Sequence, residues 1–193
     1  MKMQCKNTKR KLCGALALLS VLPGCHAMGR APPNAPQLTD AQRRLKDVGL
    51  VLVVDAVAGV EMLGVEFFAD GSDRKFYAKS LLAKRTREIM AFPISSVPER
   101  VRVMWRDSDE LVRRADNPSM STYAGDILGD YTFPIASRIP DDVVKEIRRN
   151  GGGLRLKFRL KPDGVLFGWD IERFSGGLPR HSMPGGDFLE TEY

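Results

Sequence analysis

GLRLKFRLKPDGVLFGWDIERF (residues 153–174) is the strongest structural signal in this chain of 193 residues. Apolar and polar residues alternate on both sides of Lys161-Pro162-Asp163-Gly164, which combines residue types that favour a tight turn. Pairing the two halves around this turn places four apolar pairs on one face: Leu160 with Val165, Phe158 with Phe167, Leu156 with Trp169, and Leu154 with Ile171. The segment therefore predicts an antiparallel hairpin with one buried apolar face.

The other face of this hairpin is polar. It pairs Arg155 with Asp170, and we expect Lys157 and Arg159 to remain exposed to solvent. Residues 175–193 follow, and their four glycines and two prolines predict a flexible C-terminal tail.

Two helices are indicated by their end signals. Thr39 and Gln42 have the spacing of a capping box and predict a short helix from residue 40 to about residue 46. In IPDDVVKEIRRNGGG (residues 139–153), Pro140 fits the first helical position and acidic residues follow it. Basic residues and then glycines end this second helix.

Strand patterns occupy most of the remaining chain. They lie at residues 48–57, 64–81 (two strands around a turn), 97–106 and 131–136. With the hairpin and the helices, they predict an α+β fold, mainly antiparallel β-sheet or sandwich with one or two short helices. We expect one globular domain at residues 39–174.

Residues 107–130 show no clear helical or strand period. A stretch this long inside a compact domain is often functional. Arg113 and Arg114 supply charge that orients a partner, while Met120 and Tyr123 supply contact area. We therefore expect these four residues to form a partner-binding surface, although the segment also fits a mobile loop or regular structure that its sequence does not reveal.

The N-terminal residues 1–24 are typical of a signal peptide. Five basic residues and no acidic residue precede an uncharged stretch at residues 12–22, which is too short to cross a membrane. Leu22-Pro23-Gly24-Cys25 then resembles the lipobox of bacterial lipoproteins, although Pro23 departs from the usual small residue. This predicts cleavage before Cys25 and acylation of its thiol and its freed amine.

Acylation at Cys25 implies a stable membrane anchor, because two or more acyl chains of the palmitate type hold a protein far better than one. Residues 25–38 then form a lipidated tether, with three prolines and little apolar content. His26 follows the cysteine in place of aspartate, which by resemblance to enterobacterial lipoproteins favours the outer membrane. We expect a periplasm-facing protein.

Charge and cysteine content exclude several classes of protein. The chain has 30 basic and 24 acidic residues, but removing residues 1–24 takes away five basic and no acidic ones. The remaining balance of 25 against 24 gives no reason to expect nucleic-acid binding. Cys25 would be the one remaining cysteine, so no structural disulfide is expected.

We expect no catalytic set, metal or cofactor. The two histidines, His26 and His181, lie outside the expected domain, and a Ser–His–acid site would need one of them brought back to it. The acidic clusters at residues 70–73 and 107–110 do not match a calcium-loop spacing. A small, tethered domain without these features more often binds a partner than catalyses a reaction.

VPERVRVMWR (residues 97–106), YTFPIASRIPDDVVKEIRR (131–149) and RLKFRLKPDGVLFGW (155–169) together resemble small proteobacterial lipoproteins of uncharacterised families. These are often encoded beside type VI secretion phospholipase effectors, and several serve as immunity proteins. The resemblance covers roughly residues 64–172. It implies a non-enzymatic protein that binds a secreted effector, a lipase, and neutralises it by occlusion.

Two other functions remain open at this point. One is a structural or assembly lipoprotein of the cell envelope, which binds a resident partner or peptidoglycan. The other is a periplasmic carrier of a small apolar ligand.

Overall fold

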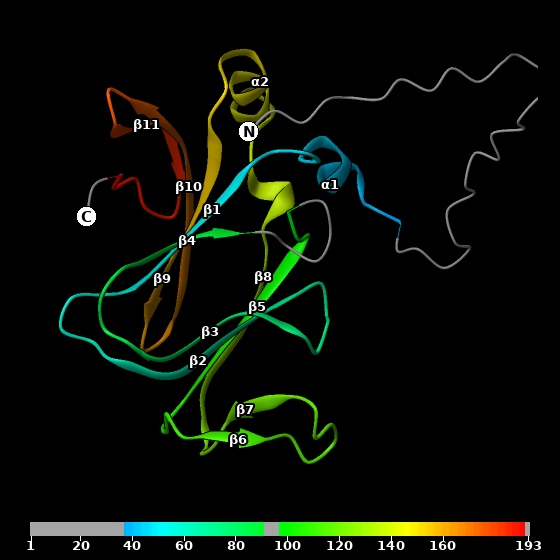
Figure 1. The fold of residues 1–193 in the computed structure, drawn as a ribbon, viewed down its shortest axis with the longest axis vertical. Coiled ribbons are helices and arrows are strands. Elements are labelled where there is room, and N and C mark those ends of the chain that lie inside the picture. Colours follow the sequence, from blue (N-terminus) through cyan, green and yellow to red (C-terminus); the bar gives the residue numbers. More distant parts are fainter. Residues whose placement is uncertain (1–36, 91–96, 192–193) are drawn as a thin grey trace, which may run out of the picture. The chain divides into compact units, whose positions relative to one another are not determined.

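Residues 37–90 and 97–191 are described by a computed structural model. The predicted signal peptide, Cys25 and the tether up to residue 36 lie outside the described residues. Within the described part, two β-sheets pack face to face, with α-helices at one end (Figure 1). The predicted α+β class, rich in antiparallel sheet and with two short α-helices in the described residues, is confirmed.

The first helix, α1 (Asp40–Arg44), begins with the predicted capping box. The Gln42 backbone N–H donates to Thr39 Oγ1 (3.1 Å), and the Thr39 N–H donates to Gln42 Oε1 (3.0 Å). The two side chains thus satisfy backbone donors that have no partner within the helix.

Sheet A has five strands in the order β11-β10-β9-β1-β4. Its members are β1 (Leu50–Ala56), β4 (Thr86–Met90), β9 (Gly153–Lys161), β10 (Gly164–Ser175) and β11 (Leu178–Gly186). The β9–β10 hairpin has the predicted register, including Phe158 opposite Phe167 and Leu156 opposite Trp169. The strands β1 and β9 are parallel, and the other neighbours are antiparallel.

Sheet B has four antiparallel strands in the order β3-β2-β5-β8. They are β2 (Met62–Ala69), β3 (Lys75–Leu82), β5 (Arg100–Arg106) and β8 (Ile127–Pro134). Val101, Val103 and Trp105 alternate along β5 and are buried. The last strand begins at Ile127, four residues before the predicted start.

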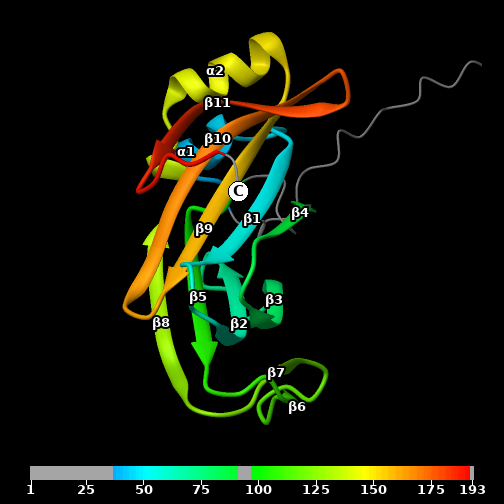
Figure 2. The ribbon, with the colours of Figure 1, turned by 90° about the vertical axis from the view of Figure 1, so that its left-hand side faces the viewer.

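A separate hairpin of β6 (Leu111–Arg113) and β7 (Ser121–Tyr123) lies in the stretch where no period was found. Strands of three residues are too short to display a period of two. After β8, η1 (Ala136–Arg138) leads to α2 (Asp141–Asn150), where Pro140 is the N-cap and not the first helical residue. Figures 1 and 2 place the β6–β7 hairpin and α2 at opposite ends of the domain.

The core lies between the two sheets. Aromatic rings from both sheets meet there: the ring centroids of Phe67 and Phe158 are 5.2 Å apart, as are those of Phe158 and Phe167. The apolar stripe of α2, formed by Val143, Val144 and Ile147, is buried in the same core. One face of each sheet is thus packed in the core, and the opposite, outer face is turned away from it.

The prediction of a flexible tail at residues 175–193 is wrong for its described part. Residues 178–186 form β11, and residues 187–191 continue across sheet A. Gly176 and Gly177 have φ of 60° and 80° and form the two-residue turn that joins β10 to β11. The glycines that suggested a loose segment therefore make a hairpin, and the domain extends beyond residue 174 to at least Thr191.

The prediction that Lys157 and Arg159 stay exposed is also wrong. Lys157 is 0 % exposed, and the Arg159 side chain is 18 % exposed. Both lie under residues 187–191, and the ring of Phe188 covers them. A sheet face with a polar pattern is thus enclosed, because a later part of the chain supplies its cover.

Candidate functional site

The predicted partner-binding residues lie in and around the β6–β7 hairpin (Figure 1). Arg113, Arg114 and Met120 line one cavity of about 480 Å³, called here the hairpin cavity. Its other wall is the outer face of sheet B, with Glu66, Phe68, Lys75, Arg102, Met104 and Arg106. The structure therefore brings three of the four predicted residues together at one site.

Two charged residues of sheet B fasten the hairpin. Lys75 Nζ lies 2.8 Å from Glu66 Oε1 and donates to the Ser121 carbonyl at 2.8 Å. Thr122 Oγ1 donates to Glu66 Oε2, also at 2.8 Å. Glu66 is 1 % exposed, so these hydrogen bonds compensate a carboxylate that has lost its water.

Tyr123 belongs to this attachment and not to the predicted contact surface. It is 8 % exposed, and Lys75 Nζ lies 5.5 Å from the centre of its ring. Burial raises the pKa of Tyr123, as do the charges of Glu66 and Asp109. A Cβ placed on Gly64 would lie 2.9 Å from the Tyr123 Cβ, so only glycine allows β2 to approach the hairpin this closely.

Arg114 is engaged within the protein. Its Nε donates to Asp116 Oδ1 (2.9 Å), and its guanidinium also donates to the Asp73 carbonyl (3.2 Å). Arg102 is likewise paired, with its Nε 2.7 Å from Asp130 Oδ1. These hydrogen bonds lower the pKa of both Asp116 and Asp130. Arg114 thus helps to shape the hairpin loop, in addition to lining the cavity.

Arg106 and Arg113 differ from these two arginines. Arg106 donates one hydrogen bond, from NH1 to the Gly125 carbonyl (2.9 Å), and its buried Nε has no hydrogen-bond partner within residues 37–90 and 97–191. Arg113 is exposed, and neither arginine forms an ion pair with a described residue.

Apolar side chains lie exposed beside the same region. Leu111, Ile127 and Leu128 are 59 %, 48 % and 61 % exposed. Ile127 lines the hairpin cavity, and Leu128 lines a second cavity of about 400 Å³ with Leu63 and Trp105. Arg106 lines both cavities, so the unpaired guanidinium lies between two hollows with apolar side chains.

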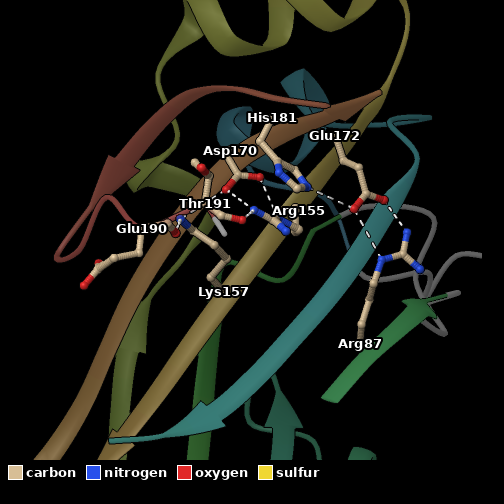
Figure 3. A network of polar contacts seen from close by, with 8 residues as sticks. All are labelled: Arg87, Arg155, Lys157, Asp170, Glu172, His181, Glu190 and Thr191. Atoms are coloured by element: carbon tan, nitrogen blue, oxygen red, sulfur yellow. Dashed lines mark hydrogen bonds and ion pairs between the residues drawn. The ribbon is translucent and has the colours of Figure 1, made fainter. Parts of the chain in front are cut away.

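A second polar cluster lies on the outer face of sheet A (Figure 3). Arg155 forms two hydrogen bonds with Asp170, each 2.7 Å, and Lys157 Nζ lies 3.1 Å from Asp170 Oδ2. All three side chains are at most 2 % exposed. Burial lowers the pKa of Lys157, and the charge of Asp170 opposes this effect only in part.

Residues 187–191, called here the C-terminal strap, close this cluster. Lys157 Nζ donates to the Glu190 carbonyl (2.8 Å), and Arg155 donates to the Thr191 carbonyl (2.7 Å). Figure 3 shows Glu190 and Thr191 directly beside these two cations. Every cation of the cluster therefore has both a carboxylate and a backbone carbonyl as partners.

Glu172 extends the cluster toward β4 and β11 (Figure 3). It pairs with Arg87 and lies 3.4 Å from His181 Nε2. Burial by itself would raise the pKa of Glu172, but the hydrogen bond and charge of Arg87 hold it below its ordinary value. The structure thus brings His181 into the domain, contrary to the prediction that it lies in a loose tail.

His181 does not complete a nucleophilic site in the part of the chain that the structure describes. Its ring contacts the Glu172 carboxylate, and no described serine or threonine hydroxyl is hydrogen-bonded to it. Residues 37–90 and 97–191 also contain no group of three or more His, Cys, Asp or Glu side chains placed to hold a metal ion. The hairpin cavity is therefore the candidate site, and its residue types suit binding.

Sequence reasoning identified Arg113, Arg114 and Met120 but missed Glu66, Lys75 and Arg106. No helix in the described residues is long and apolar enough to cross a membrane. Comparison of the chain with protein-family models, curated proteins and solved structures found no match.

Proposed function

We propose that this protein is a lipid-anchored periplasmic lipoprotein that binds and neutralises a secreted effector protein. The observation that carries the proposal is the hairpin cavity, where Arg106 and Arg113 have no ion-pair partner among the described residues. Leu111 and Leu128 are exposed beside it. Arginine, methionine and exposed apolar residues are the types that protein interfaces favour. The site offers them on a folded support.

Neutralisation would operate by occlusion. Arginine side chains that are partly desolvated and surrounded by apolar residues can carry much of the energy of an interface. Anchoring at Cys25 would hold the protein at the membrane that a lipase must reach. A tethered binder then meets its target at a high effective concentration. The resemblance to lipoproteins encoded beside type VI phospholipase effectors supports a phospholipase as the target.

The hairpin cavity is less suited to a carrier of apolar ligands. The hairpin cavity is lined by charged residues, and aromatic rings fill the space between the sheets. A structural or assembly lipoprotein would also use a protein-binding surface. It would therefore differ from an effector-neutralising lipoprotein in the partner that it binds and not in the chemistry of its binding site.

A gene deletion separates these two functions. The proposal predicts that cells without the gene grow normally alone but are killed by kin that deliver the effector through type VI secretion. Reintroducing the gene should restore survival. Equal growth defects in a deletion strain with and without the secretion system would refute the proposal and favour the structural function.

A further inference from the structure

The charges around the hairpin cavity are not balanced by pairs within the protein. Five cations and three carboxylates line it. Three of the cations have acidic partners: Lys75 with Glu66, Arg114 with Asp116 and Asp73, and Arg102 with Asp130 outside the lining. Two guanidinium groups, those of Arg106 and Arg113, remain without a carboxylate among the described residues.

The hydrogen bonding of the Arg106 guanidinium is a second, geometric indication of a binding site. Arg106 ends β5 with its NH1 fixed on the Gly125 carbonyl, while its buried Nε has no acceptor among the described residues. Buried N–H groups in folded proteins nearly always have an acceptor, from the protein, from water or from a ligand. Arg106 thus lines the hairpin cavity with a guanidinium that the described residues satisfy only in part.

We propose that the hairpin cavity is an oxyanion-binding site in which Arg106 and Arg113 hold a carboxylate group. The planar guanidinium fork matches the two oxygens of a carboxylate, and such charge-assisted hydrogen bonds are stronger than neutral ones. A volume of about 480 Å³ is within the range of small-ligand pockets. Phe68, Met104 and Met120 line the same space and suit the aliphatic stem of an acidic side chain.

The carboxylate comes from an acidic side chain of a protein partner, an assignment that rests on the function proposed above. A phospholipid phosphate is the other source of an oxyanion. The neighbouring surface disfavours it, because Asp109 and Glu110 are exposed and would be repelled by an anionic membrane. Exposed Leu111 and Leu128 instead fit the apolar part of a protein interface.

The site is tested with the purified full-length protein and no partner. Glutarate is titrated at constant ionic strength while the Nε–Hε resonances of the arginines are followed by NMR. We expect saturable shifts of Arg106 and Arg113, with a dissociation constant on the order of 1–10 mM. Arg113→Gln should weaken binding at least tenfold, read at Arg106, and Arg106→Gln should do the same, read at Arg113.

Arg100→Gln is the matched control. Arg100 lies on the same strand as Arg106 and is exposed, but it does not line the cavity, so the affinity for glutarate should change less than twofold. Arg113→Gln removes no described contact and keeps the test valid if Arg106→Gln fails to fold. Shifts that do not saturate, or that are equal in all three variants, overturn the site.

A second titration, with inorganic phosphate, distinguishes the two sources. Phosphate should bind more weakly than glutarate at the same resonances. Phosphate binding that is tenfold tighter would overturn the carboxylate assignment in favour of a lipid headgroup. These titrations contain no effector, so their result does not depend on the proposed function. Saturable glutarate binding would support the site even if the deletion strain were not sensitive to the effector. Failure of the site and failure of the proposed function can therefore be told apart.

Discussion

Both sheets carry charged residues on the face turned away from the core, and in both a different segment of the chain lies across that face. On sheet A, Lys157 joins the Asp170 carboxylate to the Glu190 carbonyl of the C-terminal strap. On sheet B, Lys75 joins the Glu66 carboxylate to the Ser121 carbonyl of the β6–β7 hairpin. The same contact, a lysine between a buried carboxylate and a backbone carbonyl, fastens both covers.

The two covered faces differ in what remains beside this contact. Under the C-terminal strap, Arg155 is closed in with Asp170 and the Thr191 carbonyl. Beside the β6–β7 hairpin, Arg106 and Arg113 line an open cavity and have no carboxylate partner in the part of the chain that the structure describes. Charges that are paired and enclosed serve folding, whereas unpaired charges at an open cavity are available to a ligand.

The largest effect is expected at the enclosed face. Asp170→Asn would remove the buried carboxylate that pairs with both Arg155 and Lys157, and breaking a buried ion pair in this way costs about 3–5 kcal/mol. Urea unfolding measures this loss. Asp163→Asn is the control, because Asp163 lies in an exposed turn, where its ion pair is with the neighbouring Lys161. Equal unfolding midpoints for the two variants would show that the cluster is not important for folding.

The C-terminal strap gives the next largest effect. Phe188 is 8 % exposed and lies 4.9 Å from Lys157 Nζ, so Phe188→Ala should lower the free energy of unfolding by about 2–4 kcal/mol. The neighbouring Leu189 is 61 % exposed, and Leu189→Ala should change it by less than about 0.5 kcal/mol. Thermal unfolding compares the two, and similar losses would contradict a closed strap.

The contacts that attach the β6–β7 hairpin should contribute less to the free energy of unfolding than those that attach the C-terminal strap. Glu66→Gln removes the carboxylate that holds Lys75 and Thr122, but the Lys75 side chain is 21 % exposed and can turn to water. We expect a loss of about 1–2 kcal/mol and faster amide hydrogen exchange in β6 and β7 than in β9 and β10. A loss as large as that of Asp170→Asn would remove the distinction between the two faces.

The smallest stability effect concerns acid pH. Burial of Asp187 raises its pKa, but hydrogen bonds from Arg138 and the Phe167 N–H outweigh this and lower it overall. A carboxyl whose pKa is lowered by folding stabilises the folded state at pH values above the ordinary carboxyl pKa of about 3.9. This stabilisation is lost as pH falls through the lowered pKa that the carboxyl has in the folded protein. The side chain is 36 % exposed, so screening limits the effect to about 1 kcal/mol.

The variant Asp187→Asn tests this sign. The wild type should be more stable than the variant at pH 7, and the difference should shrink as pH falls below the ordinary carboxyl pKa of about 3.9 and through the lowered pKa of the folded protein. Chemical unfolding at several pH values gives the two curves. A difference that grows as pH falls would contradict the lowered pKa.

Local signals predicted the framework of this fold well. The β9–β10 register followed from one turn and four apolar pairs, and the capping box of Thr39 and Gln42 followed from residues three positions apart. Such patterns depend on neighbours in the sequence, so they can be read without knowledge of the rest of the chain.

The C-terminal strap and the β6–β7 hairpin could be predicted only in part, because their contacts join residues that are far apart in the sequence. Gly176-Gly177 fits a two-residue hairpin turn as well as a flexible segment, and the residues around it do not distinguish the two. Glu66 and Arg106 occupy alternate positions in strands, which indicates the face on which they lie. Nothing in those segments reveals that a hairpin more than 50 residues beyond Glu66 covers that face. Burial of Tyr123 was missed for the same reason.

The claim that the hairpin cavity binds the effector is tested most directly with the double variant Arg106→Gln/Arg113→Gln and the control variant Arg100→Gln. Both the free energy of unfolding and the protection of cells against the effector are measured for each variant. We expect the double variant to unfold within about 1 kcal/mol of the wild type, because neither arginine has an ion-pair partner in the described protein. Cells that carry the double variant should lose protection against the effector, while Arg100→Gln cells survive. Full protection by a folded double variant would contradict the assignment of binding to the hairpin cavity.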